Sequence, residues 1–334
     1  MLATAPFSIW KGGAFATFQE LYLKVILVYL LAVNVLISPR RLERQTWVLV
    51  VVLGYFAFRA VFDYARGVNV IRGGTRVMGS VGGFMQNPND MALNMVVFLP
   101  LAAFVAMHDR SVFKRLIAAC SGVFMTGAIV ASGSRGGFLG FGAMLLVLAV
   151  FSVKKHPGFV IGGTLMVMCA VPLVPGTYWE RIASITDDSK DEVQSSQARK
   201  ALMGQSFEAF MENPLTGVGA GCFKDWNPKD RNEAWHESHN VWLQVAAELG
   251  IFGLVAFFFL VSRAVYAVIQ SRRLLRNRGA SPGDAILDAH SAAMAASLAG
   301  WLVCAFFASV AYNWTFYYLL ALAAAPREIL RVRA

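Results

Sequence analysis

The sequence predicts an all-α polytopic membrane protein, and three observations support this fold class. Hydrophobic residues make up 57% of the 334 residues and charged residues only 15%, whereas about a quarter of the residues in a soluble domain are charged. Apolar stretches recur along the chain, and their lengths are close to the roughly 20 residues that a helix needs to cross the bilayer. Basic residues cluster in alternate connections between these stretches.

The apolar stretches predict about nine transmembrane helices. We expect them to form a single membrane domain over residues 1–334, interrupted by one long hydrophilic loop subdomain at residues 176–238. The predicted spans are residues 20–38, 46–62, 90–107, 116–132, 136–152, 158–175, 239–262, 291–309 and 314–326.

The distribution of Lys and Arg predicts the orientation, because basic residues collect on the cytoplasmic side of a membrane. Fifteen of the 30 Lys and Arg residues follow the first, third, fifth and seventh spans or lie in the C-terminal tail. The loop at residues 176–238 is therefore expected outside the cytoplasm. The net charge of +10 is then largely a topology signal, and no nucleic-acid partner is expected.

The same count places the N-terminus outside, although residues 1–19 lack the charged start and cleavage site of a signal peptide. We therefore expect further helices upstream of this chain. No disulfide is expected within the chain, because its cysteines form no CxxC pair and three of the four lie within spans. The four cysteines are Cys120, Cys169, Cys222 and Cys304.

The long loop contains a predicted amphipathic helix in the stretch "SSQARKALMGQSFEAFMENP". Apolar side chains recur near helical spacing, and Asn213-Pro214 is expected to end the helix. The stripe consists of Ala201, Leu202, Phe207 and Phe210.

The stretch "LTGVGAG" follows, and its glycines allow tight turns or a close approach of the backbone to a ligand. No strand precedes them, so a dinucleotide-binding fingerprint is excluded. Gly217 and Gly219 are candidate substrate-cavity residues, and a plain loop is the alternative.

Arginines on the predicted outer side form a second group of candidates. Arg66, Arg72 and Arg76 lie in the outer connection between the second and third spans, where the positive-inside tendency disfavours them. An anionic ligand would compensate their charge. Contacts with lipid headgroups or with acidic residues of the long loop would do the same.

Arg135, in "ASGSRGGFLGF", lies where the fourth span ends and the fifth begins. A charged group at this depth usually lines a cavity or pairs with another group. A role in a site is therefore expected, and extension of the side chain into the lipid interface is the alternative.

The stretch "WHESHN" places two histidines, His236 and His239, just before the seventh span on the predicted outer side. The other histidines, His108, His156 and His290, fall at predicted cytoplasmic boundaries. Imidazole titrates near neutral pH and can accept a proton from a hydroxyl group.

Three interpretations of this pair remain open. A metal site would combine the histidines with Glu233 or Glu237, but a third ligand position is not recognisable. A helix cap by Ser238 or Asn240 would explain those residues but not the histidines. Proton transfer at an anion-binding cavity is the interpretation that we favour.

Other catalytic patterns are absent from the sequence, which has no GxSxG elbow and no P-loop. Glu248 is the main acidic residue well inside a span. It is a candidate cavity residue, and pairing with Lys24 or Arg59 is the alternative.

Several stretches, taken in order, resemble the bacterial O-antigen ligase and O-antigen polymerase superfamily. They cover nearly the whole chain, and each is weakly specific alone. They are "APFSIWKGGAF", "TRVMGSVGGFMQNPNDMAL", "SGSRGGFLG", "ARKALMGQSFEAFMENPLTGVGAGCF" and "SHNVWLQVAAELGIFGL".

The resemblance implies site residues. The family's outer arginines, which hold the carrier's diphosphate, correspond to Arg76, Arg135 and Arg199, and its essential loop histidine corresponds to His239. His236 has no firm counterpart. The family's members usually carry helices before the "PFSIW" element, which agrees with the expected N-terminus.

The resemblance also implies a fold and a function. It predicts a glycosyltransferase C-like enzyme in the bacterial inner membrane, with its active site facing the periplasm and with no metal or other cofactor. Its donor would be a glycan on undecaprenyl diphosphate, and its acceptor would be a lipid such as lipid A-core, reached by an inverting transfer. A polysaccharide polymerase, a protein O-oligosaccharyltransferase and a flippase for the same lipid are the alternatives.

Overall fold

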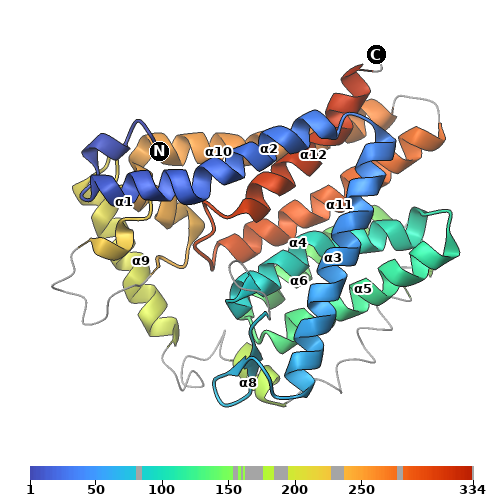
Figure 1. The fold of residues 1–334 in the computed structure, drawn as a ribbon, viewed down its shortest axis with the longest axis horizontal. Coiled ribbons are helices and arrows are strands. Elements are labelled where there is room, and N and C mark those ends of the chain that lie inside the picture. Colours follow the sequence, from blue (N-terminus) through green and yellow to red (C-terminus); the bar gives the residue numbers. More distant parts are fainter. Residues whose placement is uncertain are drawn as a thin grey trace. The chain divides into compact units, whose positions relative to one another are not determined.

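The computed structural model of the chain is dominated by long helices, which confirms the all-α class (Figure 1). Within the described part of the chain, the only strands are β1 (Val70–Ile71) and β2 (Arg76–Val77), which pair as an antiparallel hairpin. The structure describes residues 1–79, 85–152, 157–158, 161, 176–183, 195–226, 237–276 and 281–332.

The described helices differ in length. The long ones are α2 (Leu23–Val35), α3 (Pro39–Ala65), α4 (Pro88–His108), α5 (Val112–Ala131), α6 (Arg135–Ser152), α9 (Ser195–Glu212), α10 (Val241–Arg276), α11 (Pro282–Ala305) and α12 (Trp314–Val332). The short ones are α1 (Lys11–Ala16), which runs into α2 through a π-helical stretch at Thr17–Tyr22, and α8 (Gly176–Ala183).

Seven helical segments of the described residues are long and apolar enough to cross a membrane, so the chain is a multi-pass membrane protein. They are Lys11–Val35, α3, α4, α5, α6, α10 and the Gly283–Ala305 part of α11. The predicted span at residues 158–175 lies mostly outside the described residues. The predicted span at residues 314–326 falls within α12, whose last turns carry Arg327, Glu328 and Arg331 and which is not among the seven.

The described chain divides into two compact units. Unit 1 comprises Met1–Ala32, Asp191–Ala264 and Ala305–Leu320. Unit 2 comprises Val33–Lys190, Val265–Cys304 and Ala321–Ala334. The helices α10 and α12 each pass from one unit into the other. The predicted extracytoplasmic position of residues 176–238 stays a prediction.

Helix α4 forms the centre of unit 2 and packs against α3, α5 and α6. Its sequence is apolar on every side, and nearly every residue from Met91 to Val105 is buried. Small residues let the neighbouring helices approach. A Cβ atom at Gly54 of α3 would overlap Ser121 of α5, and one at Gly140 of α6 would collide with Cys304 and the Gly300 carbonyl of α11.

Unit 1 has its own small core, which connects the end of α9 to the middle of α10. The core consists of Ala209, Val218, Phe223, Trp226 and Ala247. The Trp226 indole N–H donates to the Glu212 carboxylate at 3.0 Å and so fastens the last turn of α9.

The predicted helix in the long loop is confirmed, and it ends at Glu212, directly before Asn213-Pro214. The predicted apolar stripe is wrong in part. Leu202, Ser206 and Ala209 are buried, whereas Phe207 is 53% exposed. The reason is that α9 buries the face at spacing i, i+4 and i+7, and Phe207 lies off this face.

The approach of α6 to α11 at Gly140 gives a stability prediction. Gly140→Ala should lower the melting temperature of the purified protein, because the added methyl group meets backbone and sulfur atoms of α11. Gly142→Ala, two residues further along α6, meets nothing within 4 Å. It should leave stability unchanged or raise it by up to about 1 kcal/mol, since alanine is the better helix former. Equal melting temperatures for the two variants would contradict the packing.

Candidate functional site

His239 lies in unit 1, in the turn immediately before α10, with its backbone in the left-handed region at φ 50°. Non-glycine residues rarely adopt this conformation, although histidine, asparagine and aspartate do so more often than others. Such a conformation persists where surrounding contacts fix it, and it is common at functional sites. The side chain of His239 is half-buried.

The turn that carries His239 is fixed by contacts with the segment after α11. The backbone N–H of His239 donates to the Ser309 hydroxyl at 2.9 Å. The buried hydroxyl of Ser238 lies 3.1 Å from the same oxygen and also donates to the Asn240 carbonyl at 3.1 Å. Ser309 therefore holds both residues at the entrance of α10.

Asn240 caps α10. Its side-chain oxygen accepts hydrogen bonds from the backbone N–H groups of Trp242 at 2.9 Å and Leu243 at 3.0 Å. Its amide nitrogen donates to the Phe306 carbonyl at 3.1 Å. The capping interpretation is thus confirmed for Asn240. The cap fixes the backbone around His239 and leaves the imidazole to be explained by another role.

Helix α10 is interrupted at Gly250, where φ is 65° and ψ is −164°. The interruption frees backbone groups that would otherwise bond within the helix. The segment after α9 takes them over. Val218 N–H donates to the Ala247 carbonyl at 2.8 Å, and Gly219 N–H donates to the Glu248 carbonyl at 3.0 Å. Beyond the break, Ile251 N–H donates to the Pro214 carbonyl at 2.8 Å.

Gly217 and Gly219 make this arrangement possible. Both have positive φ values, +70° and +113°. A Cβ atom at Gly217 would overlap the backbone of Glu248 and Leu249, and one at Gly219 would overlap Ser8. The close backbone approach that the sequence predicts therefore occurs, and its partners include α10 of the protein itself. A role of these glycines in substrate binding stays a prediction.

Glu248 is buried in the last turn before the break. Its carboxylate accepts a hydrogen bond from the backbone N–H of Gly221 at 2.9 Å, and the Tyr312 hydroxyl is also buried beside it. The alternative partner Arg59 forms its ion pair with Asp63 at 4.0 Å. Glu248 thus joins α10, the glycine-rich segment and the turn before α12.

Cys222 ends the glycine-rich segment and is fully buried beside Ser8. Burial raises the pKa of its thiol, with the nearby carboxylate of Glu248 acting in the same direction. A thiol kept protonated is a poor nucleophile. The segment therefore offers no cysteine nucleophile at this position.

Arg199 lies in the second turn of α9, and its side chain is half-buried. The packing contacts of the unit 1 core hold the other end of the same helix, at Ala209 and Glu212. An α-helix rises ~1.5 Å per residue, so Arg199 extends about 15 Å along the axis from Ala209.

In unit 2, Arg76 of the hairpin is buried and holds the turn between α5 and α6. Its Nε donates to the Ser132 carbonyl at 2.7 Å, and its Nη2 donates to the Asn89 side-chain oxygen in the first turn of α4 at 2.8 Å. The guanidinium group therefore joins the hairpin to the starts of two membrane helices. Arg76 therefore has a structural role, and binding of a diphosphate by its guanidinium group would be a second role.

Arg135 is the first residue of α6 and is half-buried. The Ser134 hydroxyl caps this helix by accepting from Gly137 N–H at 3.1 Å. Asn87 caps α4 by accepting from Asn89 N–H at 2.8 Å. The two helix N-termini carry partial positive charge and the two arginines carry full charges, while Asp90 in the first turn of α4 brings one negative charge, so the balance at this turn favours an anion.

The structure thus gathers Arg76 with the turn from Ser132 to Arg135 (the Arg135 turn) in unit 2. It gathers Glu248 with Gly217 and Gly219 in unit 1. Arg199 and His239 belong to unit 1, whereas Arg76 and Arg135 belong to unit 2. His236 lies outside the described residues. Among the described residues, no group of three His, Cys, Asp or Glu side chains gathers as a metal-ligand set.

Sequence reasoning missed two residues that position the site. Asn89 follows the "NP" pair that starts α4, and this pattern of a helix start could have indicated its place beside a basic side chain. Ser309 gives no signal in the sequence, because its partners lie 70 and 71 residues away along the chain.

These features define a class of protein. The chain is an all-α, multi-pass membrane protein that presents arginine and histidine residues at or near the capped starts of its helices. The family model described as O-antigen ligase matches residues 120–258. Over this segment the chain is therefore similar to the O-antigen ligase and polymerase superfamily, which confirms the resemblance.

The matched segment contains the predicted site residues Arg135, Arg199, His236, His239, Glu248, Gly217 and Gly219, whereas Arg76 and the other outer-loop arginines, Arg66 and Arg72, lie before it. It begins within α5 and ends within α10, about two turns after the break at Gly250. A search of curated protein sequences finds no match to the chain.

The break in α10 gives a second stability prediction. Gly250→Ala should destabilise the protein, because its backbone conformation is essentially confined to glycine and costs another residue about 1–3 kcal/mol, and the new methyl group would also meet the Leu215 carbonyl. Gly204→Ala in α9, where nothing lies within 4 Å, is the matched control and should be neutral or slightly stabilising. Thermal unfolding of both purified variants measures the difference. Unchanged stability of Gly250→Ala would argue against the break.

Proposed function

We propose that the protein is an O-antigen ligase-like glycosyltransferase. It transfers a glycan from a polyprenyl diphosphate carrier, of the undecaprenyl type, to an acceptor such as lipid A-core. The reaction takes place at the outer, periplasmic side of the bacterial inner membrane. The observation that carries this proposal is the O-antigen ligase match over residues 120–258, which contains Arg135, Arg199 and His239.

The proposed reaction is a single displacement with inversion at the anomeric carbon. The acceptor oxygen forms a bond to this carbon while the bond from the carbon to the carrier phosphate breaks. The diphosphate leaves with the bonding electron pair and gains negative charge. Groups that bind the leaving diphosphate more tightly than the intact donor therefore lower the barrier.

Arginine suits this task, because its planar guanidinium group can donate to two phosphate oxygens at once. Arg135 stands at the capped start of α6, where the helix N-terminus adds a partial positive charge. Arg76 supports the turn that leads into Arg135. Arg199, on α9, is the third candidate for the diphosphate.

His239 is the candidate general base. It would orient the acceptor hydroxyl group and accept its proton as the new bond forms, a contribution of roughly 10²- to 10⁴-fold. The contacts of Ser309 and Asn240 fix the backbone on both sides of His239. A fixed backbone supports this role, because a catalytic group acts best when it is held in position before the substrate binds.

The role of His239 can be tested without disturbing its backbone. His239→Asn should reduce glycan transfer by at least about 10²-fold while carrier binding and melting temperature remain near the wild-type values. Asparagine tolerates the left-handed conformation, so the variant removes the imidazole alone. Transfer is measured with purified protein, labelled carrier-linked glycan and acceptor. Near-normal turnover of this variant, together with inhibition of the wild type by a chelator, would replace the proposal with a metal mechanism.

The role of the arginines can be tested with neighbouring controls. Arg199→Gln should lower transfer by about 10²-fold or more, as expected for loss of a charge-assisted contact to the transition state. Lys200→Gln changes the next residue of α9, which is exposed, and should retain activity.

Arg135→Lys keeps the charge but loses the two-pronged geometry, so it should be impaired almost as strongly as Arg135→Ala. Full activity of either Arg135 variant would remove that residue from the site.

One assay separates the classes of function. The purified protein is placed in liposomes with labelled lipid-linked glycan and lipid A-core acceptor. A new bond to lipid A-core supports ligation, whereas longer carrier-linked glycans would indicate a polymerase and transfer to an added peptide a protein O-oligosaccharyltransferase. Movement of the lipid across the membrane without any new glycosidic bond would indicate a flippase and overturn the enzymatic proposal.

A further inference from the structure

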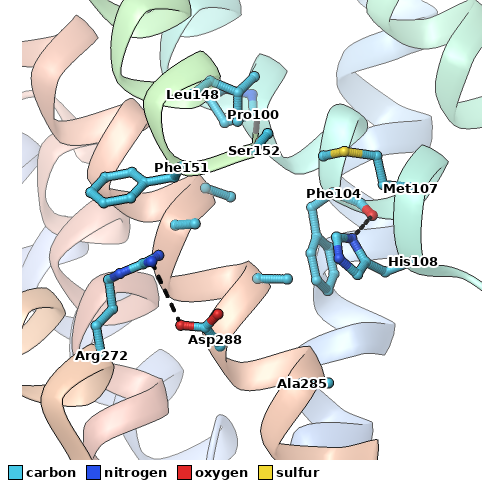
Figure 2. Close-up of a pocket in the computed structure, with 13 residues that line it drawn as sticks. Pro100, Phe104, Met107, His108, Leu148, Phe151, Ser152, Arg272, Ala285 and Asp288 are labelled. Atoms are coloured by element: carbon cyan, nitrogen blue, oxygen red, sulfur yellow. Dashed lines mark hydrogen bonds and ion pairs between the residues drawn. The ribbon is translucent and has the colours of Figure 1, made fainter. Parts of the chain in front are cut away.

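A cavity of about 270 Å³ lies within unit 2, among the ends of α4, α6, α10 and α11 (Figure 2). Its volume is far above the ~10–15 Å³ that one water molecule needs. Apolar side chains from α4 and α6, among them Phe104 and Phe151, form much of its wall. Arg272 of α10 and Asp288 of α11 add a pair of charges to this wall.

The Arg272 side of this charged pair is incompletely hydrogen-bonded by the described residues. The Nη2 atom of Arg272 and the Oδ1 atom of Asp288 are 3.8 Å apart, which exceeds the usual ~2.7–3.2 Å of a hydrogen bond. The Nη1 atom of Arg272 is buried without a hydrogen-bond partner in the described part of the chain. Partly buried charges are costly unless hydrogen bonds satisfy them, so a ligand in the cavity that supplies polar atoms would stabilise the accessible part of the guanidinium group.

The guanidinium group of Arg272 is held in place by an aromatic ring. Its central carbon lies 4.1 Å from the ring centroid of Phe151. The side chains of Arg272 and Asp288 are 24% and 20% exposed, so both remain accessible from the cavity. Figure 2 shows the pair on one side and Phe104 with His108 on the other.

The cavity and the Arg135 turn lie at opposite ends of the same two helices. Helix α4 begins beside Asn89, which contacts Arg76, and ends at His108 in the cavity wall. Helix α6 begins at Arg135 and ends at Ser152, also in the wall. Helices of this length rise about 30 Å, close to the thickness of the hydrocarbon layer. The two sites are therefore separated by about one hydrocarbon thickness along these helices.

The surroundings of the cavity suit a phospholipid headgroup. The neighbouring helix ends carry Arg110, Lys114, Arg115, Arg273 and Arg276. Lys114 lies 5.6 Å from the ring centroid of Trp47. Basic side chains and tryptophan are typical of the boundary between the hydrocarbon layer and water, and basic residues there attract lipid phosphates.

We propose that this cavity binds the headgroup of a zwitterionic aminophospholipid, of the phosphatidylethanolamine class. Its phosphate accepts hydrogen bonds from Arg272, and its ammonium group donates to Asp288. The upper part of an acyl chain packs against Phe104 and Leu148. An anionic phospholipid has no cationic group to offset the repulsion between its phosphate and the carboxylate of Asp288. This repulsion makes the cavity select the zwitterionic lipid over the anionic one.

A cavity-filling variant tests the site. The full-length protein, purified in detergent, is mixed with equal amounts of phosphatidylethanolamine and phosphatidylglycerol, and the retained lipid is counted by native mass spectrometry. Ala292→Leu should reduce retained phosphatidylethanolamine by about tenfold or more, because the added atoms fill the cavity. Ala299→Leu makes the same change two turns further along α11, outside the cavity wall, and should retain the lipid. Equal retention by the two variants overturns the proposal.

Charge variants test the chemistry. Arg272→Gln should lose retention of both lipids by about tenfold. Asp288→Asn should still retain lipid but lose the preference for phosphatidylethanolamine over phosphatidylglycerol. An unchanged preference in Asp288→Asn would overturn the assignment of the ammonium group. Melting temperatures near the wild-type value in both variants show that the fold is intact.

A soluble competitor tests whether the ligand is a membrane lipid. Glycerophosphoethanolamine carries the same headgroup without acyl chains. It should displace phosphatidylethanolamine poorly at equal concentration, because the apolar wall contributes to binding. Displacement as complete as that by the lipid itself would overturn the lipid assignment.

Discussion

The fold of unit 1 depends on one constraint, which is that a membrane-spanning helix can break only where other groups take over its backbone hydrogen bonds. Helix α10 breaks at Gly250, and the segment Pro214–Gly219 supplies the N–H and carbonyl groups that the helix loses there. This exchange ties the end of α9 to the middle of a membrane helix. It also brings the glycine-rich segment to the carboxylate of Glu248, which accepts from Gly221.

Capped helix starts are the second recurring device, and they explain how polar groups are held at the ends of an apolar fold. Ser134 caps α6 beside Arg135, and Asn240 caps α10 beside His239. A cap fixes the backbone at the point where the chain enters the membrane, so the neighbouring side chain starts from a defined position. Each helix N-terminus also contributes a partial positive charge, which suits a substrate that carries a diphosphate.

Much of the fold could be predicted, because long apolar runs and a few local signals determine it. The helix ending before Asn213-Pro214 and the cap at Asn240 follow from residues next to one another in the sequence. The break at Gly250 could not be predicted. The apolar run passes through it without interruption, glycine is common in membrane helices, and the partners at Pro214–Gly219 come from a distant loop. The burial of Arg76 was missed for the same reason, since Ser132 is 56 residues away.

The two ends of α4 and α6 use arginine in different ways, and the difference follows from the neighbours. At the Arg135 turn, two capped helix starts surround the arginines with partial positive charge, so this end favours an anion. At the other end, Arg272 stands beside Asp288, so a ligand of mixed charge fits better than a simple anion. If the Arg135 turn faces the carrier-linked substrate outside the cell membrane, the cavity faces the cytoplasmic leaflet. A lipid held there would pack between the ends of α4 and α6, the same helices whose starts carry the proposed diphosphate site. Their separation by about one hydrocarbon thickness keeps the two ligands from competing.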